Sequence, residues 1–362
     1  MLHVMTGPLT NAPDAPRATE AVRLVPATEW DALVARLGGD DVYLRHGYHV
    51  ASAHLERDGA TPVLLHIQDK GGEVALPLLL RALPDGSGYD ATSAYGYGGP
   101  AALGRPNVAA VGEKYDEWAR ANGVVATFLR LHPLLKNHQI VPPAAELIHL
   151  GDTIAWDISA DRGELMPLMH THHRRVARKA DRAGMVTRIT VNPTDLTGFR
   201  ELYEHTMRRQ EAADFYFFGD AYWDALVTKP GGDLVIIDGV LPSEEEGGEP
   251  TVVASLLCFA HGTSLHYHLG ASSDAARNIG ASNRCFLAAA EWAQSRAMTT
   301  FHLGGGVGAG TDSPLFVFKQ RYAPDSTPRP FHIAKLVHDA DRYRELAGTD
   351  STAGYFPPWR SL

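Results

Sequence analysis

The sequence predicts an α/β protein built from two domains with the same order of helices and strands. The chain has 362 residues, which is more than the roughly 100–200 residues that usually share one hydrophobic core. Apolar residues recur at helical and strand spacings in the same order in both halves. The tripeptides Glu117-Trp118-Ala119 and Glu291-Trp292-Ala293 end corresponding predicted helices, and a short strand follows each. A duplication explains both observations.

The first domain is expected to follow a disordered tail, residues 1–20, which is rich in proline and alanine and shows no periodicity. Amphipathic spacing predicts the helices, alternation predicts the strands, and glycine or proline marks most junctions. The predicted elements are a helix at 29–37, a helix at 44–57, strands at 62–68, 74–83 and 89–97, a helix at 108–122 and a strand at 124–131.

The second domain repeats this order after a connecting segment. We expect the connection to contain a strand at 153–158 and a helix from Asp161 that runs through Gly184. The acidic stretch 243–249 is interpreted as a solvated hairpin loop. The repeat itself is predicted as helices at 199–212 and 221–229, strands at 233–238, 252–260 and 264–270, a helix at 283–296 and a strand at 300–303.

Three further elements are predicted near the carboxyl terminus. Ser313 has the character of a helix N-cap, and Pro314 follows at the first helical position, where its missing N–H has no cost. This helix should end before Pro324. A strand at 330–337 and a charged helix from Asp339 complete the prediction.

Composition narrows the classes of function. The net charge of −9 argues against a protein that coats nucleic acid nonspecifically, because such binding needs clustered cations. No apolar run has the length of a signal peptide or a membrane span, so we expect a cytoplasmic protein. Cys258 and Cys285 lie in apolar stretches without the spacing of a disulfide framework or zinc site, and are interpreted as core residues.

Five phrases occur in an order and spacing that resemble one family. They are residues 90–100 (DATSAYGYGGP), 128–133 (FLRLHP), 173–180 (HRRVARKA), 267–272 (YHLGAS) and 302–306 (HLGGG), the last leading to Phe318-Lys319. In this arrangement the chain resembles the FemABX-like aminoacyltransferases of the GNAT superfamily. The resemblance covers nearly all of the chain after the tail.

The resemblance implies a fold of two tandem GNAT domains, with the last strand returning to the first domain. It divides the chain into 21–152 plus 330–362 and 153–329. It also implies a reaction that passes an amino acid from aminoacyl-tRNA to an amine of a peptidoglycan precursor or a natural-product intermediate. Aminoacyl-tRNA is then a co-substrate, and no further cofactor is expected.

The catalytic pair implied by the resemblance is Phe318-Lys319, with the lysine stabilising the oxyanion and the aromatic ring beside the ester. Aminolysis requires a neutral amine and donors aimed at the developing negative charge. The sequence contains no G-x-S-x-G, H-E-x-x-H or C-x-x-C pattern, which favours direct transfer. The apolar neighbours of Lys319 predict a strong donor in a low dielectric. The alternative is a lysine that extends from a surface helix into water.

Five cations on one predicted helix face form a candidate site for phosphate. A tRNA acceptor end or a diphosphate would suit them, and a solvated helix face is the alternative. His170, His172 and His173 precede them without a nearby carboxylate or thiolate, so a polar helix start is favoured over a metal site and no metal is predicted. The five cations are Arg174, Arg175, Arg178, Lys179 and Arg182.

Tyr95 and Tyr97 alternate along a predicted strand among glycines, which leaves the backbone open to a ligand. They are candidates for an acceptor pocket, with cross-strand aromatic packing as the alternative. The resemblance also puts Arg208, Tyr216 and His268 near the cleft of the second domain, either to bind substrate or in a structural role.

A rival donor is suggested by Arg277, Gly280 and Ala281. Together with Ser282 they approximate the R-x-x-G-x-G/A loop with which GNAT enzymes bind the pyrophosphate of acetyl-CoA at a helix N-terminus. An acyl-CoA-dependent N-acetyltransferase is therefore an alternative. A non-catalytic module that binds a small molecule or RNA is the third possibility.

Overall fold

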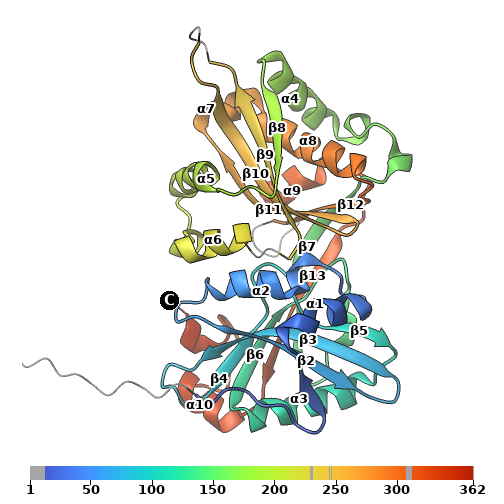
Figure 1. The fold of residues 1–362 in the computed structure, drawn as a ribbon, viewed down its shortest axis with the longest axis vertical. Helices are drawn as coiled ribbons and strands as arrows, with labels where there is room; N and C mark the ends of the chain where they lie inside the picture. Colours follow the sequence, from blue (N-terminus) through green and yellow to red (C-terminus); the bar gives the residue numbers. More distant parts are fainter. Residues whose placement is uncertain (1–12, 229–230, 244, 246, 307–311, 362) are drawn as a thin grey trace, which may run out of the picture.

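A computed structural model of the chain describes residues 13–228, 231–243, 245, 247–306 and 312–361. It shows two α/β halves stacked end to end and joined by two long strands that cross between them (Figure 1). Part of the predicted tail, residues 1–12, and two positions of the acidic stretch, Glu244 and Glu246, lie outside the described residues. Among the described segments, every helix falls short of the length and apolarity needed to cross a membrane.

The first half contains a curved sheet with helices on both faces. Its long helix, α3, begins where the Asn107 side chain accepts hydrogen bonds from the backbone N–H groups of the first turn, and it buries Tyr115 and Trp118 against the sheet. The elements are β1 (Val22–Leu24), α1 (Ala27–Arg36), α2 (His46–Ala53), β2 (Thr61–Gln68), β3 (Gly72–Ala82), β4 (Tyr89–Thr92), β5 (Ala101–Gly104), α3 (Val108–Ala121) and β6 (Val124–Arg130).

The second half repeats this plan. Its central helix is rich in alanine, which favours helix and allows close packing, and its buried face includes Phe286 and Leu287. The elements are α4 (Thr171–Arg182), β8 (Val186–Val191), α5 (Thr197–Arg209), α6 (Asp220–Thr228), β9 (Asp233–Leu241), β10 (Thr251–His261), β11 (Ser264–Ser272), α7 (Asp274–Ile279), α8 (Ala281–Ser295), β12 (Thr300–Gly305) and α9 (Pro314–Gln320).

Two exchanged strands join the halves into one sheet. β7 (Glu146–Asp157) follows the first half in the chain but pairs with β12 of the second, whereas β13 (Arg329–Val337) follows the second half and pairs with β6 of the first. β7 and β13 also pair with each other. The strand order of the sheet is β1-β2-β3-β4-β6-β13-β7-β12-β11-β10-β9-β8, with β5 beside β3. Each strand of this order in the first half therefore has a counterpart in the second half at the same distance from the opposite edge, as a duplication produces. The last strand, β13, thus pairs with β6 of the first half, where the resemblance placed it.

A shared hydrophobic core fixes the halves against each other. It contains Trp30 and Tyr48 from the first half and Phe199, Tyr222 and Phe259 from the second. Helix α2 packs on α6 at this junction. Burial of each large aromatic side chain contributes about 1.5–3 kcal/mol to the free energy of unfolding. Because both halves share this core, their relative position is fixed, and so is the geometry of the space between them.

Several predicted boundaries are corrected by local backbone chemistry. The predicted strand at 89–97 ends at Thr92, because the following loop contains Gly96 and Gly99 with φ values of +93° and +88°, which a strand does not allow. The helix predicted from Asp161 is two separate 3₁₀ turns, 160–162 and 166–168, before α4 begins at Thr171. The helix predicted at 44–57 is a 3₁₀ turn followed by the shorter α2.

The short strands β1, β5 and β8 were not predicted. Each lies near a sheet edge and pairs with a single neighbour in the sheet, so burial does not impose a strong hydrophobic pattern. In the tail region, residues 13–18 have no regular structure, but Arg17 is fixed: its backbone oxygen accepts from Trp118 Nε1 at 2.8 Å and its N–H donates to Asn122 Oδ1 at 2.6 Å.

Candidate functional site

A buried lysine lies in the cleft where the halves meet. Helix α9 places it there: the Ser313 hydroxyl caps the helix by accepting from the Phe316 N–H, and Phe316 anchors the helix in the core. The Lys319 side chain is only 6% exposed. Its Nζ donates to the Gly305 oxygen at 2.7 Å and lies 5.2 Å from the centre of the Tyr267 ring. It lines a cavity of about 370 Å³.

Burial lowers the pKa of Lys319 to about 7, because removal from water disfavours the charged amine. No carboxylate among the described residues forms an ion pair with it. At neutral pH the side chain therefore alternates between ammonium and amine, and as ammonium it has N–H groups free to bind an oxyanion in a low dielectric.

Both halves supply walls to this cavity. Tyr43 and Tyr97 come from the first half, Thr153 from β7, and Tyr267 and His268 from β11. Gly304 leaves the centre open: its φ is +73°, and a Cβ there would lie 3.3 Å from both Lys319 Nζ and the Tyr97 hydroxyl oxygen. These two polar groups therefore face the same empty space, which is where a reacting carbonyl could sit.

A buried hydrogen-bonded chain lies beneath the cavity and links the halves. Asp41 Oδ2 accepts from His266 Nε2 at 2.8 Å, the Nδ1 atoms of His266 and His302 are 3.3 Å apart, and His302 Nε2 is 3.0 Å from Thr153 Oγ1. All four residues are buried. The chain connects the wall of the cavity, at Thr153, to a carboxylate in the first half.

The same cluster includes His132, whose Nε2 is 3.2 Å from Asp41 Oδ1. Burial by itself would raise the pKa of Asp41, but the imidazoles of His132 and His266 outweigh it and hold the pKa well below its usual value. Burial lowers the pKa of His302 well below its usual value. These groups are electrostatically coupled across the boundary between the halves.

The cluster does not fit a metal ion in this arrangement, although one ligand atom from each of Asp41, His132 and His266 lies within 4.8 Å of the others. The backbone N–H of Leu134 donates to His132 Nδ1 at 3.2 Å. The ring proton is therefore on Nε2, the nitrogen that faces Asp41, where a metal would need a lone pair. The residues are better described as an acid–base network that joins the halves.

His268 is held in its neutral form at the cavity wall. Burial lowers its pKa to about 3. Its Nδ1 is 3.3 Å from the Tyr43 hydroxyl and its Nε2 is 2.8 Å from the Tyr222 hydroxyl. A neutral imidazole donates with one nitrogen and accepts with the other, so one tyrosine donates to the ring and the other accepts from it.

Comparison with known proteins finds a family model that matches most of the second half. Residues 169–312 match the model of the acetyltransferase (GNAT) domain. The search of curated proteins finds no match to the sequence.

Solved structures extend the fold to the whole chain. FemX is 15% identical, with a TM-score of 0.66 over 90% of this chain and 99% of FemX. L-PGS from Bacillus licheniformis is 15% identical, with a TM-score of 0.55 over 91% and 94%. The C-terminal domain of a putative lysylphosphatidylglycerol synthetase from Agrobacterium fabrum is also 15% identical, with a TM-score of 0.52 over 93% and 98%. The chain therefore has a fold of two tandem GNAT-like domains, as the sequence predicted.

Three residues predicted to bind substrate lie at the cleft between the GNAT halves, namely Tyr95, Tyr97 and His268. The tyrosines belong to the loop after β4 rather than to a strand. Phe318 is not among the residues that line the cavity. Its ring packs in the core of the second half, 5.0 Å from His173 and 5.4 Å from Tyr322 between ring centres.

The histidines at the start of the basic helix have structural roles. His173 Nε2 donates to the Phe318 oxygen at 2.8 Å, and His170 caps α4 by accepting from the His172 N–H. The His170 N–H also donates to the Arg321 oxygen at 2.8 Å. These contacts tie the start of α4 to the helix that carries Lys319.

Two predicted substrate-binding residues lie away from the cavity. Arg208 is exposed and pairs with Glu204 at 2.7 Å on α5. Tyr216 is 42% exposed in a 3₁₀ turn, Asp214–Tyr216. Neither lines the Lys319 cavity.

The basic helix α4 presents most of its cations to water. Arg174 is half-buried and donates to the Pro167 oxygen at 2.7 Å. The other four have no ion-pair partner within the described ranges. They are Arg175, Arg178, Lys179 and Arg182, and all are exposed.

The candidate CoA loop lies against α4. Gly280 has a φ of +77°, and a Cβ there would be 2.3 Å from Val176 Cγ1. Ala281 is fully buried, whereas Arg277 is exposed on α7. A diphosphate could approach the N-terminus of α8 closely only if α4 moved.

Sequence reasoning missed Asp41, His132, His302, Arg130 and Thr153. Three of them, His132, His302 and Arg130, stand inside the phrases that carry the family resemblance. Asp41 follows two glycines and an aspartate in a loop, and its imidazole partners, His132 and His266, are distant in the sequence. Only the fold brings them together.

Proposed function

We propose that the protein is an aminoacyltransferase that forms an amide by passing an amino acid from aminoacyl-tRNA to an amine. The observation that carries the proposal is the Lys319 side chain, buried in a cavity that both halves line and without a carboxylate partner among the described residues. The FemABX-like resemblance of the sequence and the FemX-like fold agree with it.

In this reaction the neutral amine attacks the carbonyl carbon of the ester, and the carbonyl oxygen becomes negative. The Lys319 ammonium donates to that oxygen and stabilises the tetrahedral intermediate. The C–O bond to the ribose then breaks, the amide forms, and the proton released by the amine ends on the ribose oxygen. A lysine pKa of about 7 suits this transfer, since the group gives up and regains a proton easily at neutral pH.

The exposed cations of α4 support a charged donor. Arg178, Lys179 and Arg182 form a face without carboxylate partners among the described residues, suited to the phosphates of a tRNA acceptor end. Contacts from His170 and His173 connect this helix to α9, so bound RNA and the catalytic lysine would share one rigid frame. The acceptor amine belongs to a peptidoglycan precursor or a natural-product intermediate, and the reaction takes place in the cytoplasm, where charged tRNA is made.

A transfer assay tests the proposal. Mixed charged tRNA and a panel of amines are incubated with the protein, and amide products are identified by mass spectrometry. We expect product that depends on intact tRNA and is lost with Lys319→Met. The matched control is Arg296→Gln, an exposed site at the end of α8. Product that persists after the donor is pretreated with RNase would contradict an RNA-borne donor.

Acyl-CoA is the second candidate donor, favoured by the acetyltransferase family model over residues 169–312 and by the loop at Arg277. Calorimetry with acetyl-CoA separates the two, since an acyl-CoA enzyme should show saturable binding that is weakened by Arg277→Gln, a change at an exposed position. A non-catalytic binding module is the third candidate. It would keep its ligand with Lys319→Met and show no turnover in either form.

A further inference from the structure

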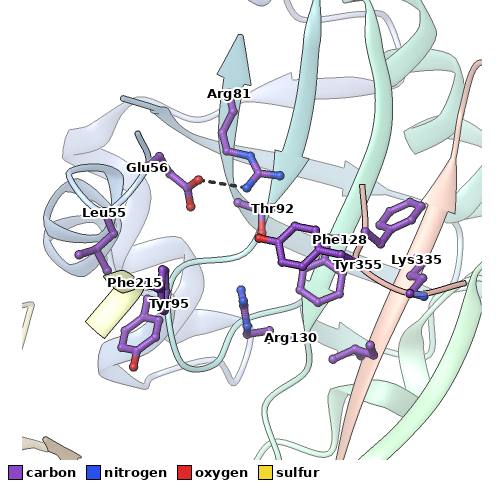
Figure 2. A pocket seen from close by; sticks show the side chains of 13 residues that line it. Leu55, Glu56, Arg81, Thr92, Tyr95, Phe128, Arg130, Phe215, Lys335 and Tyr355 are labelled. Carbon is purple, nitrogen blue, oxygen red and sulfur yellow. Dashed lines mark hydrogen bonds and ion pairs between the residues drawn. The ribbon is translucent and has the colours of Figure 1, made fainter. Parts of the chain in front are cut away.

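A second cavity, lined mainly by the first half, is shown in Figure 2. Its volume is about 210 Å³. Tyr95 and Arg130 line both this cavity and the Lys319 cavity, so the two spaces adjoin at these side chains. The floor comes from four neighbouring strands, through Arg81 on β3, Thr92 on β4, Arg130 on β6 and Lys335 on β13.

The three cations of this cavity differ in their partners. Arg81 is neutralised: it donates to Asp90 Oδ1 at 2.6 Å and to Glu56 Oε2 at 3.0 Å. Asp90 is fully buried and also accepts from Arg360 at 2.9 Å. The carboxylates near the cavity are therefore already engaged by arginines.

Arg130 and Lys335 have no carboxylate partner among the described residues. The Arg130 guanidinium lies 5.0 Å from the Phe128 ring centre, and in Figure 2 it points into the space between Tyr95 and Tyr355. Lys335 is 6% exposed and its Nζ donates to the Thr352 oxygen at 2.5 Å. Positive charge removed from water without a counter-ion is costly, and an anion bound between these groups would remove the cost.

Aromatic side chains cover the rest of the cavity. Phe128 and Phe356 form its inner wall. Phe215 and Tyr355 stand at the rim, 44% and 61% exposed, from the second half and the carboxyl-terminal segment. Large exposed rings at a concave site indicate a ligand with an apolar body. The volume is below the roughly 300–1,000 Å³ of pockets for drug-sized ligands, which suits a group the size of one amino acid.

We propose that this cavity binds the acceptor, and that the acceptor is a small amine carrying an anionic group, carboxylate or phosphate, on an apolar or aromatic body. The planar guanidinium of Arg130 donates two hydrogen bonds to the anion, and Lys335 adds positive charge. The aromatic rings pack against the apolar part of the ligand. The amine then projects past Tyr95 toward Lys319. The role of this ligand as the acceptor rests on the proposed function. The binding of an anionic, apolar ligand in the cavity does not depend on it.

Calorimetry on the full chain tests the cavity without tRNA or turnover. The anionic probes are 3-phenylpropionate and phenyl phosphate, and the uncharged and cationic comparisons are 3-phenylpropan-1-ol and phenethylamine. We expect at least one anionic probe to bind tenfold or more tightly than both comparisons. Arg130→Gln should reduce that affinity at least tenfold, and the exposed control Arg296→Gln should leave it unchanged. Which anion binds better identifies the acidic group.

A second variant protects the test against misfolding. Tyr355→Ala removes an exposed rim ring and should weaken the anionic probe several-fold without changing thermal stability. Equal binding of charged and uncharged probes, or binding unchanged by both variants, would overturn the proposal. If the anionic probe binds as expected but no amine is acylated from charged tRNA, the proposed function fails and the assignment of the cavity stands.

Discussion

Within the part of the chain that the structure describes, each half buries one lysine in the same manner, and only one of these two lysines is placed for chemistry. Lys319 and Lys335 are both 6% exposed. Each donates to a backbone oxygen, of Gly305 and Thr352, and each lies within 6 Å of an aromatic ring centre. Lys319 opens onto the cleft between the halves, whereas Lys335 lines the cavity inside the first half.

The difference arises from the segments that come after the corresponding strands. In the second half, β12 ends in glycines and leads to α9, whose turn brings Lys319 back over the strand end. In the first half, β6 ends at Arg130 and leads to a 3₁₀ turn, Asn137–Ile140, and the buried lysine comes from the exchanged strand β13 instead. One fold therefore uses a buried cation twice, for a developing oxyanion and, as we propose, for a bound anion.

The largest expected effect separates these roles. Lys319→Met should lower the rate of transfer roughly 100- to 1,000-fold, the cost of losing an oxyanion donor, with little change in the KM for the acceptor. Lys335→Met should instead raise that KM and leave the single-turnover rate at saturation nearly unchanged. Single-turnover kinetics at varied acceptor concentration measure both. Equal loss of rate in the two variants would end the distinction.

The next effect concerns the junction of the halves. Asp41→Asn removes the carboxylate that bridges His132 and His266 and should lower the free energy of unfolding by about 3–5 kcal/mol. The pKa of Asp41 is held below its unfolded value, so its contribution is present above about pH 4 and is lost as the pH falls further. Urea unfolding at pH 7 and pH 3 should show the difference from the wild type shrinking at the lower pH.

Lys319 should also affect stability in a pH-dependent way. Its pKa is about 7 in the folded chain and about 10.4 when unfolded, so between these values the unfolded chain binds more protons. Stability relative to Lys319→Met should then rise with pH, by up to about 1.4 kcal/mol per pH unit from pH 7 to 9. Thermal unfolding of both proteins across this range measures it. A flat difference would contradict the low pKa.

The smallest expected effect lies on α4. Changing Arg178, Lys179 and Arg182 together to glutamine should raise the KM for charged tRNA roughly tenfold and make the log–log salt slope shallower by about 2. The rate at saturating tRNA should not change. Initial rates at several salt concentrations test this, with Arg296→Gln as the control. An unchanged salt slope would assign these cations to an ordinary solvated face.

Much of the fold could be predicted because local pattern and tertiary structure agree. The long strands β3 and β10 and the helices α3 and α8 are buried on a regular face, so their periodicity is strong. The exchange of β7 and β13 depends on pairing between segments far apart in the sequence, and only the family resemblance indicated part of it. Edge strands such as β8 alternate between exposed and half-buried positions and give a weak signal.

The candidate site could be predicted only in part for a related reason. Lys319 stands out because a charged residue occurs within an apolar helix. Arg130 and Asp41 can be recognised only from their surroundings in the fold. Arg130 has no counter-ion among the described residues, and Asp41 lies beside two imidazoles that are distant in the sequence. For Arg208 and Phe318 the sequence was misleading. The resemblance put both at the active site, but the helices that carry them direct their side chains away from the cavity.

The crossing of β7 and β13 also bears on how the chain is made. The first half offers β6 as an open sheet edge until its partner β13, which begins at Arg329, has left the ribosome. Both halves up to β13 must therefore be synthesised before the sheet of the first half is complete, and an unpaired edge strand is a site for wrong association. A ribosome that stalls after α9 would leave a chain in which β6 and β7 have no β13 between them.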